Sequence, residues 1–223
     1  MLLSYKKAGY IKHIRHNLYA AADLVSGNSL ADRFEIGSNV HPNAYISHHS
    51  ALEFHGIANQ VYSQITITAP ARIHSFEYEG IFYEVHPEKI HSGVIVPPLS
   101  PFVSVTNIER TVIDCFYNID LAGGLEELIE SINLIPSLNE ALLLLYLDEY
   151  NQIFLWQKTG FILEQFKDAL QLSDSFFTEC QSHIHNRKKT LDASGASRYY
   201  PEWKLYAPVN LFDLISDGGD ALV

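Results

Sequence analysis

The pattern of apolar residues changes once along this chain of 223 residues, from a period typical of strands to one typical of helices. Between residues 61 and 105, short alternating stretches are separated by Gly- and Pro-containing turns, which predicts four or five strands. From about residue 107 onward, apolar residues recur every three or four positions, as in amphipathic helices. The sequence therefore predicts an α+β fold, with a small mixed or antiparallel sheet followed by a helical C-terminal half.

The expected elements follow from these local patterns. Strands are predicted at 61–68, 73–78, 81–86, 94–96 and 102–105, and the second and third flank Glu79-Gly80, which suits a tight hairpin turn. Helices are predicted near 47–55, 107–117, 121–133, 138–149, 153–170 and 174–185. A last strand is expected at 203–206, followed by a frayed tail.

Helix starts and burial can also be read from the residue types. Ser47 is expected to cap the first of these helices, and Thr106 with Glu109 and Ser137 with Glu140 fit capping boxes. The helix at 138–149 is apolar almost all round, so it is predicted to be buried.

The first 22 residues predict a separate unit, made of a helix end, a glycine and a basic β-hairpin. A helix is expected at 2–7 with Gly9 as its C-terminal cap, and strands at 10–15 and 18–22 flank a turn at His16-Asn17. This segment has four cations and no acid, whereas the whole chain has a net charge of −11. The rest of the chain therefore has a net charge of −15, and the asymmetry points to a basic contact element on an acidic body.

Composition excludes several classes of protein. The longest apolar run, at 141–147, is too short for a membrane-spanning helix, and the sequence shows no secretion signal. Cys115 and Cys180 have neither a disulfide framework nor a metal-binding spacing, so a reducing cytoplasm is expected. The net negative charge argues against general nucleic-acid binding by the whole surface.

Several polar groups have both a functional and a structural interpretation. His49 and Glu53 share a helix face and could bind a metal, or could satisfy local hydrogen bonds. The cluster at 183–189 could contact phosphates, or could be a solvated helix end, which we prefer. Arg110 and Asp114 are spaced as an ion pair, and Cys115 is expected in the core. No nucleophile elbow or phosphate-binding loop is present in the sequence.

An acidic segment at 111–157 contains no Lys, Arg or His. Several of its eight acids are expected on one solvated helical face. That face either provides solubility or meets a basic partner. The eight acids are Asp114, Asp120, Glu126, Glu127, Glu130, Glu140, Asp148 and Glu149.

Three segments together resemble the AbiEi family, which supplies the antitoxin and transcriptional regulator of AbiE-type toxin–antitoxin systems. The first, at 9–19, is GYIKHIRHNLY and is similar to the wing of the family's winged helix. The second, at 45–56, is YISHHSALEFHG, and the third, at 103–114, is VSVTNIERTVID. A weaker likeness lies at 203–205. Their order and spacing carry the resemblance.

The resemblance implies three regions: a winged-helix remnant at 1–23, a linker with a short helix at 24–44, and an antitoxin domain at 45–223. It implies a cytoplasmic protein that represses its own operon at promoter DNA and counteracts a nucleotidyltransferase-like toxin, with or without stable contact. Neither an enzymatic activity, a cofactor nor a metal is expected. DNA contacts are predicted for Ser4, Lys6, Lys7, Lys12, His13, Arg15 and His16, and they are expected to be weak or partial because most of the recognition helix is missing.

Two other functions remain open at this point. The acids and histidines could serve a metal-dependent enzyme that processes nucleic acids or nucleotides. Alternatively, the chain could be a protein-interaction module that has lost DNA binding.

Overall fold

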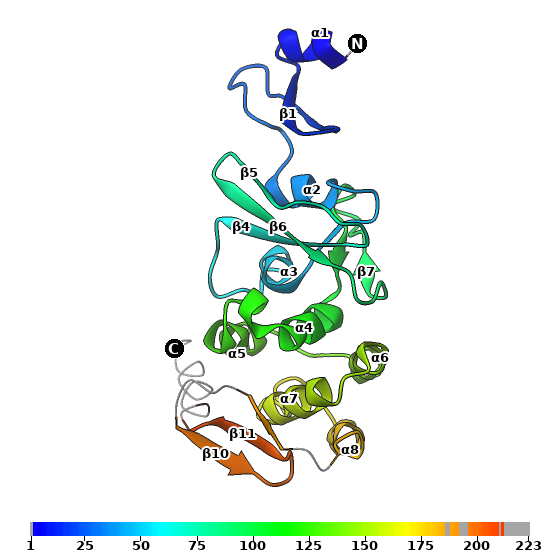
Figure 1. Ribbon diagram of the computed structural model, residues 1–223, viewed down its shortest axis with the longest axis vertical. Helices are drawn as coiled ribbons and strands as arrows, with labels where there is room; N and C mark the ends of the chain where they lie inside the picture. Colours follow the sequence, from blue (N-terminus) through cyan, green and yellow to red (C-terminus); the bar gives the residue numbers. More distant parts are fainter. Residues whose placement is uncertain (1, 186–187, 192–195, 210, 212–223) are drawn as a thin grey trace.

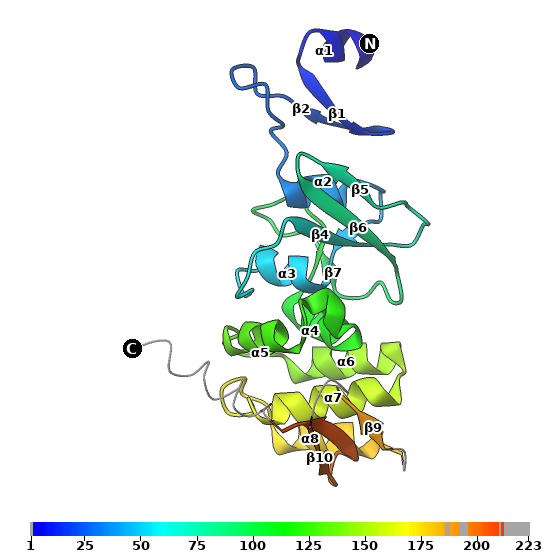
Figure 2. The same ribbon diagram turned by 60° about the vertical axis from the view of Figure 1, so that its left-hand side comes forward.

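The elements of the chain are stacked along one long axis (Figures 1 and 2). The computed structural model describes every residue except 1, 186–187, 192–195, 210 and 212–223. An N-terminal unit lies at one end, followed by a six-stranded sheet with its helices, then a layer of helices and a small three-stranded sheet. The predicted α+β fold is confirmed.

The N-terminal unit has the predicted order of helix, glycine and hairpin. Helix α1 (Leu2–Lys7) is followed by Gly9 in the left-handed region, with φ of 78°. Strand β1 (Ile11–Arg15) pairs antiparallel with β2 (Leu18–Ala21), and Asn17 takes the positive φ of the turn, at 59°.

The large sheet is mixed, with strand order β5-β6-β4-β3-β8-β7. Its strands are β3 (Tyr45–Ile46), β4 (Gln64–Ala69), β5 (Phe76–Tyr78), β6 (Ile81–Pro87), β7 (Val94–Ile95) and β8 (Val105–Thr106). β4 pairs parallel with β6 and antiparallel with β3. The predicted hairpin turn is confirmed by φ angles of 49° at Glu79 and 78° at Gly80.

Strand β4 separates two differently built layers. Ile65 and Ile67 face helix α2 (Arg33–Ser38). They pack so closely on Gly37 of this helix that a Cβ atom added to the glycine would lie 3.0 Å from Ile65 and 3.4 Å from Ile67. Thr66 and Thr68 alternate with these isoleucines and point towards α3 (His48–Phe54): Thr68 Oγ1 lies 2.8 Å from Ser47 Oγ, and the backbone N–H of Thr66 donates to Ser50 Oγ.

The structure corrects the linker predicted at 24–44, because α2 belongs to the sheet. Ile36, Gly37 and Ser38 are buried, and Ile36 packs in one core with residues of β3, β4 and β8. The helix begins at Arg33 because Asp32 and Glu35 form a capping box there.

Of the three predicted helix caps, one is at its expected residue and two are displaced along the chain. Ser47 is the N-cap residue of α3 but makes no capping hydrogen bond, since its Oγ bonds Thr68 Oγ1 at 2.8 Å. Asn107, not Thr106, caps α4 (Ile108–Tyr117), and Asn139, not Ser137, caps α6 (Glu140–Tyr150). Glu109 bonds the backbone N–H of Asn139 instead of its own helix start.

The remaining helices are η1 (Ile119–Ala122), α5 (Leu125–Asn133), α7 (Ile153–Glu164) and α8 (Asp174–Ser182). The prediction that the helix at 138–149 is buried all round is wrong. In α6 only Leu143, Tyr146 and Leu147 are buried, whereas α7 is buried at every residue from 155 to 163. α7 contacts α4, α6 and α8, so it is the central helix of this half.

The last described strands form a sheet with order β10-β11-β9. They are β9 (Lys189–Thr190), β10 (Ser197–Tyr200) and β11 (Leu205–Pro208). β11 begins two residues after the predicted start, since Trp203 and Lys204 belong to a turn in which Lys204 has a φ of 47°. β9 and β10 were not predicted, and the expected frayed tail falls mainly on 212–223, outside the described residues.

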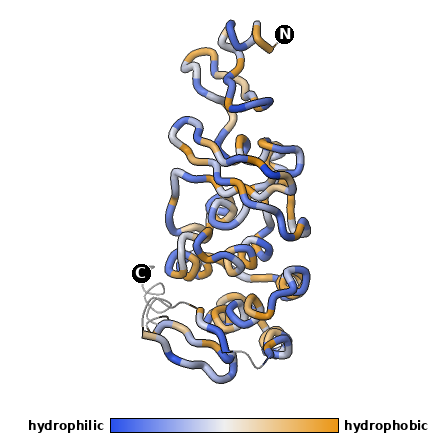
Figure 3. The backbone as a smooth tube through the Cα atoms, in the orientation of Figure 1, coloured by the Kyte–Doolittle hydropathy of each residue, from blue (hydrophilic) through white to orange (hydrophobic). Residues whose placement is uncertain are grey.

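Apolar packing forms two clusters, one around the sheet and α2 and one among the helices and the small sheet. Hydrophobic segments accordingly recur in the sheet and in the helices below it (Figure 3). None of the helices among the described residues is long and apolar enough to cross a membrane.

Candidate nucleic-acid interface and buried polar sites

The N-terminal unit presents most of its predicted DNA-contacting residues to solvent. Ser4, Lys6 and Lys7 are exposed on α1, a helix with no buried residue. Tyr5 and Tyr10 bring α1 against the start of β1, with ring centroids 6.2 Å apart. Lys6 and Lys7, in the last turn of α1, therefore belong to the same small unit as the hairpin (Figure 1).

The hairpin holds three of the other predicted residues. Lys12 is half-buried and lies opposite Ala20 in the hairpin. The small side chain of Ala20 leaves the aliphatic stem of Lys12 accessible. His13 is exposed and packs on Tyr19, with ring centroids 4.9 Å apart. His16 is exposed in the turn.

Arg15 is placed differently from the other six. Its Nη1 donates a hydrogen bond to the backbone oxygen of His74 at 3.1 Å, and its guanidinium carbon lies 4.6 Å from the centroid of the Phe76 ring. Ile14 and Leu18 pack against the core of the sheet from the same hairpin. The turn end of the hairpin is thus docked on the body, and Arg15 is part of that contact.

A second feature is a buried charge network at the junction of the sheet and the helices. The imidazole of His49 lies between two carboxylates, with Nδ1 3.2 Å from Glu53 Oε1 and Nε2 3.0 Å from Glu127 Oε1. Glu53 pairs in addition with Arg33 from α2. The predicted His49–Glu53 contact is present, but Glu127, which lies 78 residues away in sequence, joins it.

Further hydrogen bonds hold the carboxylates of this network in place. Glu127 Oε1 also accepts from the backbone N–H groups of Asn59 and Gln60, each at 3.0 Å. Both ring nitrogens of His49 thus face carboxylate oxygens that have other partners. Burial opposes ionisation of Glu53, but hydrogen bonds from His49 and Tyr62 and the charge of Arg33 outweigh it and lower its pKa.

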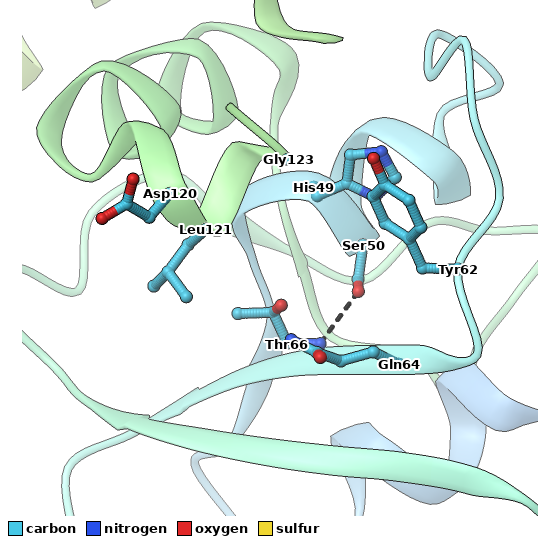
Figure 4. Close-up of a pocket in the computed structure, with 8 residues that line it drawn as sticks. All are labelled: His49, Ser50, Tyr62, Gln64, Thr66, Asp120, Leu121 and Gly123. Atoms are coloured by element: carbon cyan, nitrogen blue, oxygen red, sulfur yellow. Dashed lines mark hydrogen bonds between the residues drawn. The ribbon is translucent and has the colours of Figure 1, made fainter. Parts of the chain in front are cut away.

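A cavity of about 250 Å³ opens beside His49, between α3, β4 and η1. Figure 4 shows Ser50 with its hydroxyl directed at the backbone of Thr66, from which it accepts a hydrogen bond of 2.8 Å. Asp120 and Leu121 approach from η1 on the other side. The hydroxyl and imidazole groups here are already engaged in internal contacts.

A second cavity, of about 190 Å³, lies between β4, β6, α4 and α6. Its wall includes the predicted pair of Arg110 and Asp114, whose side chains are each 1% exposed and 2.6 Å apart. Arg110 also donates to the backbone oxygens of Ser92 and Ile90, and the hydroxyl of Tyr150 donates to Asp114 at 2.5 Å. These bonds join α4, α6 and the 90–92 loop, so the arrangement is structural.

His48 lines the same cavity in a strained backbone conformation. Its φ is 51°, although it is neither Gly nor Asn, and its side chain is buried. Burial lowers the pKa of His48 to about 4, so the imidazole is neutral near pH 7. Its Nδ1 is 2.9 Å from Ser47 Oγ. A strained backbone and a perturbed pKa beside a cavity are typical of functional sites. The sequence analysis did not single out His48 by itself.

Three other predictions can be compared with the structure. The acidic segment is solvated only in part, because Asp114 and Glu127 are buried in the contacts above. At the end of α8, His183 is half-exposed; its ring stacks on Trp156, with centroids 3.9 Å apart, and pairs with Glu179, while Asn186 and Arg187 lie outside the described residues. Cys115 and Cys180 are buried and unpaired with each other, as expected for core residues.

Metal binding by the His49–Glu53 pair has no support in this geometry, since both ring nitrogens are taken by carboxylates. Within the described part of the chain, no group of three or more His, Cys, Asp or Glu side chains is arranged to hold a metal ion.

Comparison with known proteins identifies a fold but no family. No family model and no curated protein matches this sequence. Among solved structures, the chain is similar to the crystal structure of the Rv2827c protein from Mycobacterium tuberculosis, with a TM-score of 0.67 and 14% sequence identity. The match covers 96% of this chain and 82% of that chain. At this identity the likeness shows a shared α+β fold and nothing about activity.

Proposed function

We propose that this protein is an antitoxin-like transcriptional regulator of the AbiEi type, which binds its own promoter DNA through the N-terminal unit and counteracts a nucleotidyltransferase-like toxin in the cytoplasm. The observation that carries the proposal is the exposed basic helix and hairpin at one end of an acidic molecule. The ordered motifs at 9–19, 45–56 and 103–114 support it.

The charge distribution supports DNA contact by the N-terminal unit. Lys6, Lys7 and Lys12 belong to a unit without acids, whereas the rest of the chain has a net charge of −15. Phosphate contacts fix a protein on the duplex but carry no sequence information. We therefore assign Lys6, Lys7 and Lys12 to the DNA backbone, with Ser4, His13 and His16 close by on the same unit.

Titration of the promoter fragment tests this assignment. Lys12→Ala and Lys6→Ala/Lys7→Ala should weaken binding, and each lost phosphate contact should lower the slope of log K against log salt by about one. Arg72→Ala is the matched control, because Arg72 is an exposed cation on the body. Unchanged affinity and salt slope in the lysine variants would remove the proposed interface.

The antitoxin role needs its own assay. Co-expression with the toxin encoded beside the gene should restore growth, and the lysine variants should keep this rescue while losing DNA binding. Rescue without any DNA binding by the unmodified protein would instead favour the interaction module. Absence of both activities would end the regulatory proposal.

A further inference from the structure

The C-terminal sheet carries a second basic and aromatic surface, at the opposite end of the molecule from the N-terminal unit (Figures 1 and 2). In β11, Leu205 and Ala207 are buried against the helices, so the side chains that alternate with them lie on the outer face. Tyr206 is one of these, and it pairs directly with Tyr199 of β10. The outer face therefore presents two adjacent tyrosines.

The tyrosines are arranged with a cation beside them. The ring centroids of Tyr199 and Tyr206 are 4.9 Å apart, with a tilt of 42° between the planes. The ammonium of Lys188, which is exposed, lies 4.8 Å from the centroid of the Tyr199 ring. This contact holds the cation over one face of the Tyr199 ring.

More cations border the same sheet. Arg198 is exposed, with its guanidinium carbon 5.7 Å from the Tyr200 ring, and Lys189 Nζ lies 5.7 Å from the Phe154 ring. In the sequence, residues 183–209 have five Lys or Arg and two acids, which gives this segment a net charge of +3, whereas the whole chain has a net charge of −11. The segment around this sheet is therefore basic although the chain as a whole is acidic.

We propose that the outer face of the C-terminal sheet, centred on Tyr199, Tyr206 and Lys188, binds single-stranded nucleic acid. Aromatic side chains on an open sheet stack on unpaired bases, whose faces are inaccessible within a duplex. Lys188 would meet a phosphate between stacked bases. A single strand would use both features, because its bases stack on the tyrosines and its phosphates meet the cation. An acidic protein surface or duplex DNA would use the charge but would not stack bases on the aromatic pair.

Fluorescence anisotropy with labelled dT and dA oligomers of about 20 nucleotides, at about 50 mM salt, tests the proposal. The protein should carry Lys6→Ala/Lys7→Ala/Lys12→Ala, so that the N-terminal unit does not contribute. We expect binding to persist in this background and to weaken at least tenfold in Lys188→Glu. Tyr199→Leu/Tyr206→Leu, which keeps the charge and the apolar bulk, should also weaken it about tenfold.

The matched control is Lys89→Glu, which makes the same change of charge on an exposed residue of the body. It should leave oligomer binding within about twofold of the background protein. An equal loss in this control, no binding of either oligomer, or tighter binding of a duplex of the same length would each overturn the proposal. Because the N-terminal lysines are already removed, these outcomes are independent of promoter binding.

Discussion

The guanidinium of Arg15 stacks on the ring of Phe76, 4.6 Å from its centroid, and so joins the N-terminal hairpin to the six-stranded sheet. Phe76 is itself stacked on buried Tyr83, with ring centroids 4.7 Å apart and planes 6° from parallel. The hairpin is thus held by a side chain that rests on the core of the sheet.

Arg15→Ala should loosen the hairpin without unfolding the body. A cation–π contact at a partly exposed site stabilises by roughly 0.5–1 kcal/mol, and the hydrogen bond to His74 is lost with it. We expect faster amide hydrogen exchange at 11–21 and unchanged exchange in α7. Lys12→Ala is the control, since Lys12 makes no such contact with the sheet among the described residues. Equal protection of the hairpin in Arg15→Ala and the unmodified protein would contradict a docking role.

Arg110→Ala should destabilise the protein by about 3–5 kcal/mol, because it leaves the buried carboxylate of Asp114 without its cation. Urea unfolding measures this loss. Arg110→Met/Asp114→Leu removes both charges and should recover part of it. Lys167→Ala, which breaks an exposed ion pair with Asp174, should have no measurable effect. A double variant as unstable as Arg110→Ala would show that the loss is not due to an unpaired charge.

Acid should destabilise the fold through His48 before it acts on Glu53. The unfolded state binds a proton at His48 near pH 6.5, whereas the folded state does so only near pH 4. The stabilisation is therefore complete above pH 6.5 and is lost as the pH falls towards 4, by up to roughly 3 kcal/mol. The lowered pKa of Glu53 means that its own contribution is lost only below its ordinary value of 4.5.

The window between pH 6.5 and 5 therefore separates the titration of His48 from that of Glu53. His48→Asn tolerates the positive φ but does not titrate, so its free energy of unfolding should fall less over this window than that of the unmodified protein. Urea unfolding at several pH values provides the comparison. Parallel curves for the two proteins would show that His48 is not the titrating group.

Gly160→Ala should destabilise the junction between α7 and the C-terminal sheet. The added Cβ would lie 2.3 Å from the Trp203 ring and 3.0 Å from the Cβ of Cys180, and Trp203 is fully buried. Overpacking of this kind costs about 1–3 kcal/mol. In a double-mutant cycle, Gly160→Ala should cost less when Trp203 is replaced by Phe. Additive losses would indicate that the methyl group is accommodated elsewhere.

Elements defined by neighbouring residues were predictable from the sequence. The turn at Glu79-Gly80 and the cap at Gly9 depend on backbone conformations that few residues adopt, so both were located correctly. The end of the last helix was placed three residues too late. The capping boxes failed because Glu109 and Glu140 each serve a different helix, where they accept from Asn139 and Ser173, a use that only the tertiary structure reveals.

The buried sites were predictable only in part. Spacing along a helix paired His49 with Glu53 and Arg110 with Asp114, because such partners are four residues apart. Nothing local connects His49 with Glu127, or Asp114 with Tyr150. Hydrophobicity alone predicted that α6 is buried. The prediction failed because a leucine-rich helix can still lie with one side in solvent.

Strand β4 has a further consequence for how the chain finds its pairing. Its isoleucines meet α2 on one face. On the other face Thr68 Oγ1 bonds Ser47 at the start of α3, and the backbone N–H of Thr66 bonds Ser50. A slip of one residue against β6 would exchange the two faces and set hydroxyl groups against aliphatic carbon. Such a slip is unfavourable in both layers, so the packing on each face of β4 independently favours the observed register with β6.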